Sequence, residues 1–457
     1  MKMNPRRHKG LKDDDRKMAP PKPERARGDR PAGTLFRLGH CRELLDEVLA
    51  APATPADLII SRFFAKRRYL GSHDRGYIAD TVYGTLRAVL RLRFILQEME
   101  GEDDAGRLIA ACLMERGERA DESALREALG LHGREIASIA AAVEAAPARI
   151  AALDEPQRTA VRFGFPMWFA ARVIGQMGGA EGELLLASLG EQAPVTLRAN
   201  TLVAGRDRLA EALAARDVVT VPGSHAPDAL LLARRMNANA IPEFKLGWFE
   251  LQDEGSQLLS LLLDPHPNWK VFDACAGAGG KTLHMAAIMR GRGAIIAHDL
   301  NGRRLMEIRP RLRRSGAQNV RVMEHERYLE QRKSLAGAFD AVMIDAPCSG
   351  AGVLRRTPGA RLTFEEEMVD RLVVQQREIL EEYAALVKPG GLLLYATCSL
   401  LREENEMQVE RFLAEHPSWS IRPLPAPPDM ITSRGFFRCF PHRHGTDAFF
   451  GALLQRG

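Results

Sequence analysis

The stretch Val271-Phe-Asp-Ala-Cys-Ala-Gly-Ala-Gly-Gly-Lys-Thr-Leu-His-Met285 combines a short apolar strand, a glycine-rich loop and the start of a helix. Glycine allows the backbone to adopt positive φ angles and to come close to a ligand. In a doubly wound α/β sheet, the loop after the first strand is where a nucleotide-like ligand binds. The stretch therefore predicts a ligand-binding loop on a sheet of this class.

Four further apolar runs follow this loop, and the segments between most of them are long enough for helices. The runs are Ala294–Asp299, Val320–Met323, Ala341–Asp345 and Leu392–Thr397. Continuous apolar strands that alternate with helices are typical of a parallel sheet covered on both faces. We expect the last apolar run, Ala448–Leu454, to add an edge strand. The fold class is thus a Rossmann-like α/β domain.

Two known motifs compete for the glycine loop. Gly280-Lys281-Thr282 resembles the end of a P-loop, but that motif needs glycine at position 275, which is Cys275. The dinucleotide fingerprint fits better by spacing but lacks its full glycine register. Asp299 ends the second predicted strand, where an acid accepts hydrogen bonds from ribose hydroxyls. Loop and acid together predict a nucleoside cofactor, and they leave S-adenosylmethionine and a dinucleotide both open.

Two cysteines follow the fourth and fifth predicted strands, Cys348 in Asp345-Ala-Pro-Cys-Ser-Gly350 and Cys398 in Thr397-Cys-Ser399. Strand ends beside the switch point of the sheet line the ligand crevice, so we expect both cysteines in one pocket. Free cysteines are more often buried apolar side chains. We accept that interpretation for the remaining candidates Cys41, Cys112 and Cys439.

A thiol near a sulfonium donor fits one particular chemistry. A thiolate that adds to C6 of cytosine makes C5 able to attack a methyl group, which is nucleophilic catalysis by an activated thiolate. Asp345 can hydrogen-bond N3 and the exocyclic amine of the base. Lys281 can offset developing negative charge or lower the pKa of a thiol. The alternative interpretation is that Lys281 is only a charged residue at the start of a helix and contacts no ligand.

Composition limits the class of protein. The chain has 457 residues, 46% of them hydrophobic and 27% charged, as expected of a globular protein of about three domains. No apolar run reaches the roughly 18 residues of a membrane helix, and the charged N-terminus is unlike a secretory signal. The six cysteines include no CxxC pair, so we expect no disulfide framework, no metal site and a reducing cytoplasmic location.

The chain divides into four predicted parts. Residues 1–33 carry 11 Lys/Arg, 5 Asp/Glu and no aromatic residue, and we expect a disordered basic tail. Such a tail attracts nucleic acid, or it only keeps the protein in solution. Residues 34–190 show helical spacing of apolar residues, 191–265 mix short strands with one helix, and 266–457 form the α/β domain.

Several of these motifs resemble those of the Sun-type RNA cytosine-5 methyltransferases. The match covers Asp273–Thr282, Asp345–Gly350, Thr397–Leu400 with Glu403-Glu404-Asn405-Glu406, and the closing Pro441–Phe450. Upstream, Leu35–Ile95 is similar to a NusB-like helical RNA-binding domain, and Arg198-Ala199-Asn200 with Gly247–Gln257 resembles the α+β module before the catalytic domain.

The resemblance implies S-adenosylmethionine as methyl donor and RNA as partner, with ribosomal RNA of the small subunit as the expected substrate and neither a membrane nor an obligate protein partner. It implies Cys398 as nucleophile and Cys348 in product release, an order that the residues alone do not settle, because DNA cytosine methyltransferases attack with the Pro-Cys cysteine. A tRNA substrate, or an inactive RNA-binding assembly factor, remains the alternative.

The implied donor contacts are Asp299 on the ribose, Asp345 near the methionine part and Glu326 near the adenine, with the loop formed by Cys275, Ala276, Gly277, Ala278, Gly279, Gly280 and Lys281. The loop departs from the family pattern because Ala278 stands where the family has proline. A glutamate at 326 replaces the aspartate that the family has after the third strand.

Overall fold

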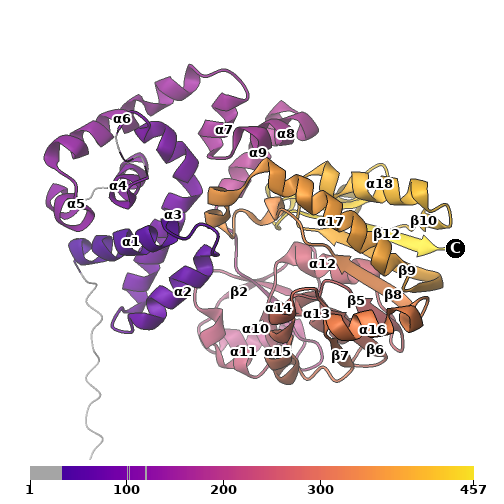
Figure 1. Cartoon of the computed structure of the whole chain (residues 1–457). Helices are drawn as coiled ribbons and strands as arrows, with labels where there is room; N and C mark the ends of the chain where they lie inside the picture. The colour runs from indigo at the N-terminus through magenta and orange to yellow at the C-terminus, as the bar shows by residue number, and fades with distance from the viewer. Residues whose placement is uncertain (1–32, 100, 102, 119–120) are drawn as a thin grey trace, which may run out of the picture.

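The computed structural model describes residues 33–99, 101, 103–118 and 121–457, so the predicted tail lies outside the described residues except for Gly33. Among the described residues, nine helices precede the first strand, and Figure 1 shows most of them as a separate lobe beside the α/β part. Their bounds are α1 Thr34–Leu49, α2 Ala56–Lys66, α3 Ser72–Leu96, α4 Ala105–Glu115, α5 Glu122–Leu129, α6 Gly133–Ala151, α7 Gln157–Phe163, α8 Met167–Met177 and α9 Gly179–Gly190.

The nine helices contribute to two different hydrophobic cores. Helices α1–α6 enclose one cluster that includes Leu45, Leu86 and Leu108. Apolar residues of α7–α9 instead pack against loops of the α/β domain, where Leu186 shares a cluster with Leu354. The last three helices therefore hold the helical lobe against the α/β domain.

Arg361 stabilises the contact between the helical lobe and the α/β domain through hydrogen bonds. This residue lies in the 3-10 turn η3 (Pro358–Thr363), and its guanidinium is buried. It donates to the carbonyl oxygens of Gly164 at 3.0 Å and Leu189 at 2.9 Å, and also to that of Arg87. Burial lowers the pKa of Arg361 to about 9. One side chain thus connects α3, the end of α7 and α9 to the α/β domain.

A four-stranded antiparallel sheet in the order β2-β3-β1-β4 follows the helical lobe. Its elements are β1 Thr196–Ala199, α10 Arg206–Ala214, β2 Thr220–Pro222, β3 Ala229–Leu232, η1 Ala238–Ala240, α11 Pro242–Lys245 and β4 Phe249–Leu251. Helix α12, Glu254–Leu263, then packs on the next sheet so closely that a Cβ on Gly255 would lie 2.8 Å from Phe449 Cδ2. Glycine at this position permits that approach.

The α/β domain contains an eight-stranded sheet in the order β10-β12-β9-β8-β5-β6-β7, with β11 also paired to β12. Its strands are β5 Lys270–Asp273, β6 Ala294–His298, β7 Val320–Met323, β8 Phe339–Asp345, β9 Val387–Thr397, β10 Trp419–Ile421, β11 Phe437–Cys439 and β12 Phe449–Arg456. The helices are α13 Gly280–Ile288, α14 Gly302–Met306, α15 Ile308–Ser315, α16 His325–Leu335, α17 Glu366–Ala384, α18 Glu406–Glu415 and α19 Pro441–His444. The short 3-10 turns are η2 Ala351–Val353, η4 Arg402–Glu404 and η5 Pro428–Met430.

The predicted Rossmann-like class is confirmed, because β5 to β9 pair in parallel and both faces of the sheet are covered. Alternate residues of β8 point to opposite faces. Val342 and Ile344 belong to the core beneath α17, whereas Ala341 and Met343 pack on the side of α12 and α13. In the part of the chain that the structure describes, none of the helices is both long and apolar enough to cross a membrane.

The prediction for the last apolar run is wrong in one respect. Strand β12 is not an edge strand, because it pairs antiparallel with β9 on one side and with β10 and β11 on the other. Strands β10 and β11 have three residues each. Runs this short carry no readable alternation of apolar and polar residues, so the sequence did not reveal the strands that cover β12.

Candidate active site

The glycine loop after β5 takes the conformation that its sequence predicts. Gly277 and Gly279 have φ angles of +53° and +85°. The backbone N–H of Gly277 donates to Asp299 Oδ2 at 2.7 Å, and that of Asn301 donates to Asp299 Oδ1 at 2.7 Å. The structure therefore brings the loop and the predicted ribose acid together at the ends of β5 and β6.

Gly279 is the tightest position of the loop. A Cβ there would lie 2.2 Å from Ile308 Cγ1, in addition to the strain of a positive φ. At the neighbouring Gly280, the nearest atom to an added Cβ is Arg311 Nη2 at 3.9 Å. The two adjacent glycines thus differ in how much space a methyl group has.

Gly279→Ala is expected to destabilise the protein by about 1–3 kcal/mol, because the new methyl group overlaps Ile308 and the backbone is strained. Thermal unfolding in the absence of cofactor measures the effect, and Gly280→Ala is the matched control, with a midpoint close to that of the unsubstituted protein. Equal midpoints for the two variants would show that the loop is not held as described.

Lys281 and Asp345 form an ion pair beside the loop. Lys281 Nζ lies 2.6 Å from Asp345 Oδ2, and the same ammonium group lies 5.6 Å from the centre of the Phe449 ring. Behind them, the buried Asp273 accepts a hydrogen bond from Thr282 Oγ1 at 2.6 Å, and burial raises the pKa of Asp273 to about 7. The charged groups at the ends of β5 and β8 are therefore linked to the first turn of α13.

The two cysteines predicted to share a pocket do meet. Cys348 Sγ lies 3.3 Å from Cys398 Sγ, and both side chains are partly exposed. The hydrogen bond to Cys398 and burial raise the pKa of Cys348 well above its usual value, and the charge of Glu404 adds to the effect. Cys41, Cys112 and Cys439 are buried, in agreement with their interpretation as apolar side chains.

Glu404 joins the two cysteine loops, a role that sequence reasoning missed. Its carboxylate is fully buried and accepts four hydrogen bonds. One oxygen accepts from the backbone of Ser349 at 2.8 Å and from Gln376 Nε2 at 3.0 Å, and the other accepts from the hydroxyls of Ser349 and Ser399. Because these serines directly follow the two cysteines, the carboxylate fixes the distance between the loops.

Asn405 supports the second of these loops from the next position. Asn405 Nδ2 donates to the carbonyl of Ser399 at 2.9 Å, and its Oδ1 accepts from the hydroxyl of Thr397. The Asn405 side-chain amide therefore binds the residues on both sides of Cys398, namely Thr397 and Ser399. The only signal in the sequence was the family motif Glu403–Glu406, which indicates membership but not this geometry.

No hydrogen bond or ion pair joins Glu326 to the glycine loop among the described residues. Its side chain is exposed in the first turn of α16 and lines a polar hollow with Arg309 and Glu324. The preceding residue, His325, is half-buried instead, with Nδ1 3.3 Å from His298 Nε2. Burial and the charge of His325 lower the pKa of His298 to about 4.

Comparison with known protein families gives two matches. A family described as "16S rRNA methyltransferase RsmB/F" matches residues 260–455, which include both cysteines and the glycine loop. A second family, described as an RsmF/B-like "ferredoxin-like domain", matches residues 165–239. The latter begins at Phe165, within the residues assigned above to the helical domain.

Individual relatives agree with these matches. The chain is 31% identical over 420 residues to the "Probable ribosomal RNA small subunit methyltransferase B" of Bacillus subtilis, covering 86% of this chain and 92% of that protein. It is 33% identical over 306 residues to the "Ribosomal RNA small subunit methyltransferase B" of Sodalis glossinidius, covering 66% of this chain and 68% of that protein.

Two solved structures are also similar. The crystal structure of PH0851 has a TM-score of 0.78 and 26% identity, covering 92% of this chain and 99% of that chain. A methyltransferase homologue from Pyrococcus horikoshii has a TM-score of 0.58 and 29% identity, covering 65% of this chain and 98% of that chain. Since the similarity extends over nearly the full length of a relative, this chain belongs to the 16S rRNA methyltransferase RsmB/F family.

Proposed function

We propose that the protein transfers a methyl group from S-adenosylmethionine to C5 of a cytosine in RNA, with small-subunit ribosomal RNA as the substrate. The observation that carries this proposal is the 3.3 Å contact between Cys348 and Cys398 at the ends of two adjacent parallel strands. Family membership and the names of the relatives support the methyl transfer and the class of RNA.

The chemistry assigns one cysteine to each half of the reaction. The Cys398 thiolate adds to C6, and the electron pair of the C5–C6 double bond makes C5 nucleophilic. C5 then takes the methyl group, a base removes the C5 proton, and the bond between C6 and sulfur breaks as the double bond re-forms. The family resemblance implies attack by Cys398 and release by Cys348, and we adopt that order; the raised pKa of Cys348, which arises first from its hydrogen bond to Cys398, is in line with it.

The other predicted side chains would orient the base and the donor. Asp345 would accept from the exocyclic amine of cytosine or lie near the methionine part of the donor, and Lys281, paired with it at 2.6 Å, would balance charge. The bare backbone at Gly277 and Gly279 and the carboxylate of Asp299 beside it fit a nucleoside ligand. S-adenosylmethionine bound there would supply an electrophilic methyl group. The exposed Glu326 is the one proposed contact without a link to the loop among the described residues.

Access to C5 requires that the cytosine be single-stranded or flipped out of a helix. Basic side chains of the helical lobe support a role in holding such RNA. Arg87, Arg91, Arg116 and Arg162 line one hollow where α3, α4 and α7 meet. Guanidinium groups bind phosphate through several donors at once, so this hollow fits an RNA backbone.

The function is tested by incubating the protein with labelled S-adenosylmethionine and with unmodified small-subunit ribosomal RNA or tRNA. We expect label on C5 of cytosine in the ribosomal RNA, located by bisulfite sequencing. Label on tRNA alone would change the substrate but keep the chemistry. If no RNA is labelled and the protein does not bind the donor, the result would instead support an inactive RNA-binding assembly factor.

A further inference from the structure

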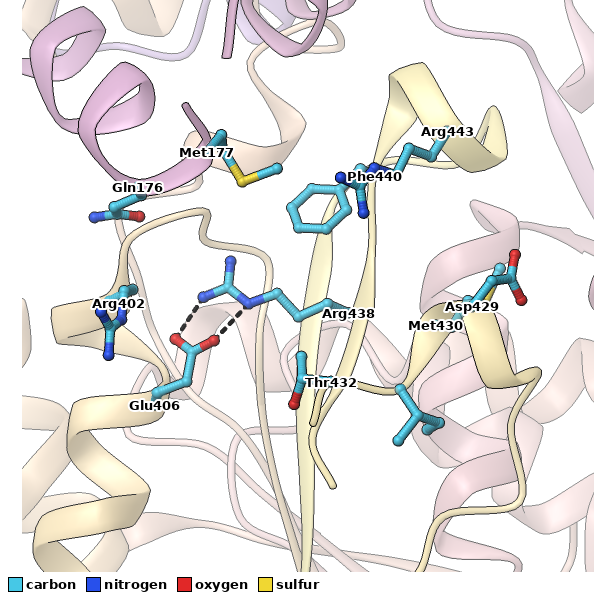
Figure 2. A pocket seen from close by; sticks show the side chains of 11 residues that line it. Gln176, Met177, Arg402, Glu406, Asp429, Met430, Thr432, Arg438, Phe440 and Arg443 are labelled. Carbon is cyan, nitrogen blue, oxygen red and sulfur yellow. Dashed lines mark hydrogen bonds and ion pairs between the residues drawn. The ribbon is translucent and has the colours of Figure 1, made fainter. Parts of the chain in front are cut away.

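A pocket of about 320 Å³ lies beside the segment that follows Cys398, and none of its lining residues belongs to the glycine loop. We call it the arginine pocket, and Figure 2 shows its lining. Its residues come from the end of α8, from η4 and the first residue of α18, from the segment before β11, and from β11 to α19: Gln176, Met177, Arg402, Glu406, Asp429, Met430, Ile431, Thr432, Arg438, Phe440 and Arg443.

The pocket opens on the same edge of the sheet as the nucleophile. Strands β9 and β11 both pair antiparallel with β12, so they run in the same direction. Their last residues, Thr397 and Cys439, pair with the adjacent positions Phe450 and Phe449. The ends of β9 and β11 are thus two strand spacings apart, about 10 Å.

The wall of the pocket is also bonded directly to the catalytic loop. Arg438 Nη1 donates at 3.1 Å to the carbonyl of Leu400, two residues after Cys398. Arg402 follows Cys398 by four residues, so their Cα atoms are at most about 14 Å apart. The pocket is therefore close enough to Cys398 to contact an RNA strand whose cytosine reaches that residue.

Some guanidinium N–H groups of the arginines that line the pocket have no acceptor in the part of the protein that the structure describes. Arg438 is neutralised by Glu406 through two hydrogen bonds, one of them 2.8 Å long, as the dashed lines of Figure 2 show. Arg443 forms an ion pair with Glu181 through its Nε, and its two Nη atoms have no hydrogen-bond partner among the described residues. The exposed guanidinium of Arg402 has no hydrogen bond or ion pair with any other described residue.

The lining also contains the carboxylate of Asp429, whose negative charge disfavours the binding of an anion. Asp429 is without an arginine or lysine partner among the described residues. It lies 3.7 Å from His444 Nε2, and burial lowers the pKa of that histidine, which favours its neutral form. The Asp429 side chain is 68% exposed, so its effect inside the pocket is screened by water. The Phe440 ring, Met177 and Met430 supply apolar surface beside the free guanidinium groups.

This combination fits one unit of the RNA backbone. Guanidinium groups bind a phosphate through parallel hydrogen bonds, and the apolar part of the lining suits a sugar. At the 3.4 Å rise per nucleotide of a stacked strand, 10 Å corresponds to about three nucleotides, and to fewer where a base is flipped out.

We infer that the arginine pocket binds a phosphodiester of the substrate RNA within three nucleotides of the target cytosine, through Arg402 and Arg443. The inference rests on the proposed function, because it takes the position of the target base from Cys398. This contact would hold the RNA strand beside a base that has left its stack. The binding free energy would then offset part of the free energy needed to flip the base out. Arg402 acts on binding and not on the reacting atoms.

The first test compares Arg402→Gln with Arg411→Gln, a control in α18 whose arginine pairs with Glu415 outside the pocket. Binding to small-subunit ribosomal RNA transcribed in vitro is measured at several salt concentrations. We expect Arg402→Gln to weaken binding about tenfold and to reduce the salt slope by about 0.7, the value for one phosphate of a single strand. The control should match the unsubstituted protein, as should donor binding by both variants.

The second test locates the phosphate. Short RNAs around the methylated cytosine each carry one uncharged methylphosphonate linkage. We expect that one methylphosphonate, at a linkage within three nucleotides of the target cytosine, weakens the binding of RNA to the unsubstituted protein. The same methylphosphonate should not weaken the binding of RNA to Arg402→Gln any further. Equal affinity and salt slope for Arg402→Gln and the unsubstituted protein would overturn the inference even if RNA is methylated. The binding experiment needs no turnover, so its result stands apart from a failure to methylate.

Discussion

Cys348→Ala is expected to accumulate a covalent protein–RNA adduct, whereas Cys398→Ala should form none. Both variants should lose multiple-turnover methylation, by about six orders of magnitude for Cys398→Ala, as when a serine protease loses its nucleophile. The reason is that the bond between Cys398 and C6 forms without Cys348 but does not break efficiently without it. Denaturing electrophoresis with labelled RNA measures the adduct.

Cys112→Ala is a suitable control for this experiment, because it removes a buried thiol from the helical lobe. This variant should methylate RNA and leave no adduct. If the adduct instead accumulated with Cys398→Ala, the two cysteines, 3.3 Å apart, would have exchanged roles. If neither variant changed activity, the covalent mechanism would be wrong.

Glu404→Ala is expected to abolish most activity and to lower the free energy of unfolding by about 3–5 kcal/mol, as when one member of a buried charged network is removed. Four donors lose their acceptor at once, and the two cysteine loops lose the group that joins them. Urea unfolding measures the stability, and single-turnover methylation measures the alignment of the cysteines.

Two further variants separate alignment from folding. Glu404→Gln keeps the size of the side chain but places an amide N–H₂ against donors, so we expect slower adduct formation with a smaller loss of stability. Glu403→Gln alters the adjacent residue, which is half-buried and pairs only with Arg172 among the described residues. It should behave like the unsubstituted protein. A Glu404→Gln variant with unchanged adduct kinetics would show that the carboxylate does not set the geometry of the cysteines.

The sequence predicted the elements whose signal is local. The strand, glycine loop and helix from Val271 to Met285 are present, and β7 has the predicted bounds Val320–Met323. Apolar runs and glycine positions report backbone conformation over a few residues, which is why these elements could be read directly. The bounds of the domains remain a prediction, and so do the roles of the site residues.

Contacts between distant segments could not be read in this way. Arg356 donates to both Asp253 and Asp447, so it joins two motifs that the sequence showed separately. The exposed position of Glu326 and the inward position of His325 depend on how α16 leaves β7, and adjacent positions of a helix face different sides. Neither result follows from composition or spacing.

The sequence by itself determined the class of sheet, the ligand loop and the two strand ends that carry thiols, because periodicity and strand direction are properties of short segments. Only the tertiary structure decided that α7–α9 pack on loops of the α/β domain, that Glu404 joins both cysteine loops, and that Arg402, Arg438 and Arg443 line one pocket. These features arise from side chains that lie far apart in the chain, such as Leu186 and Leu354, which are 168 positions apart. Their contact depends on the packing of whole elements, for which the local sequence carries no signal.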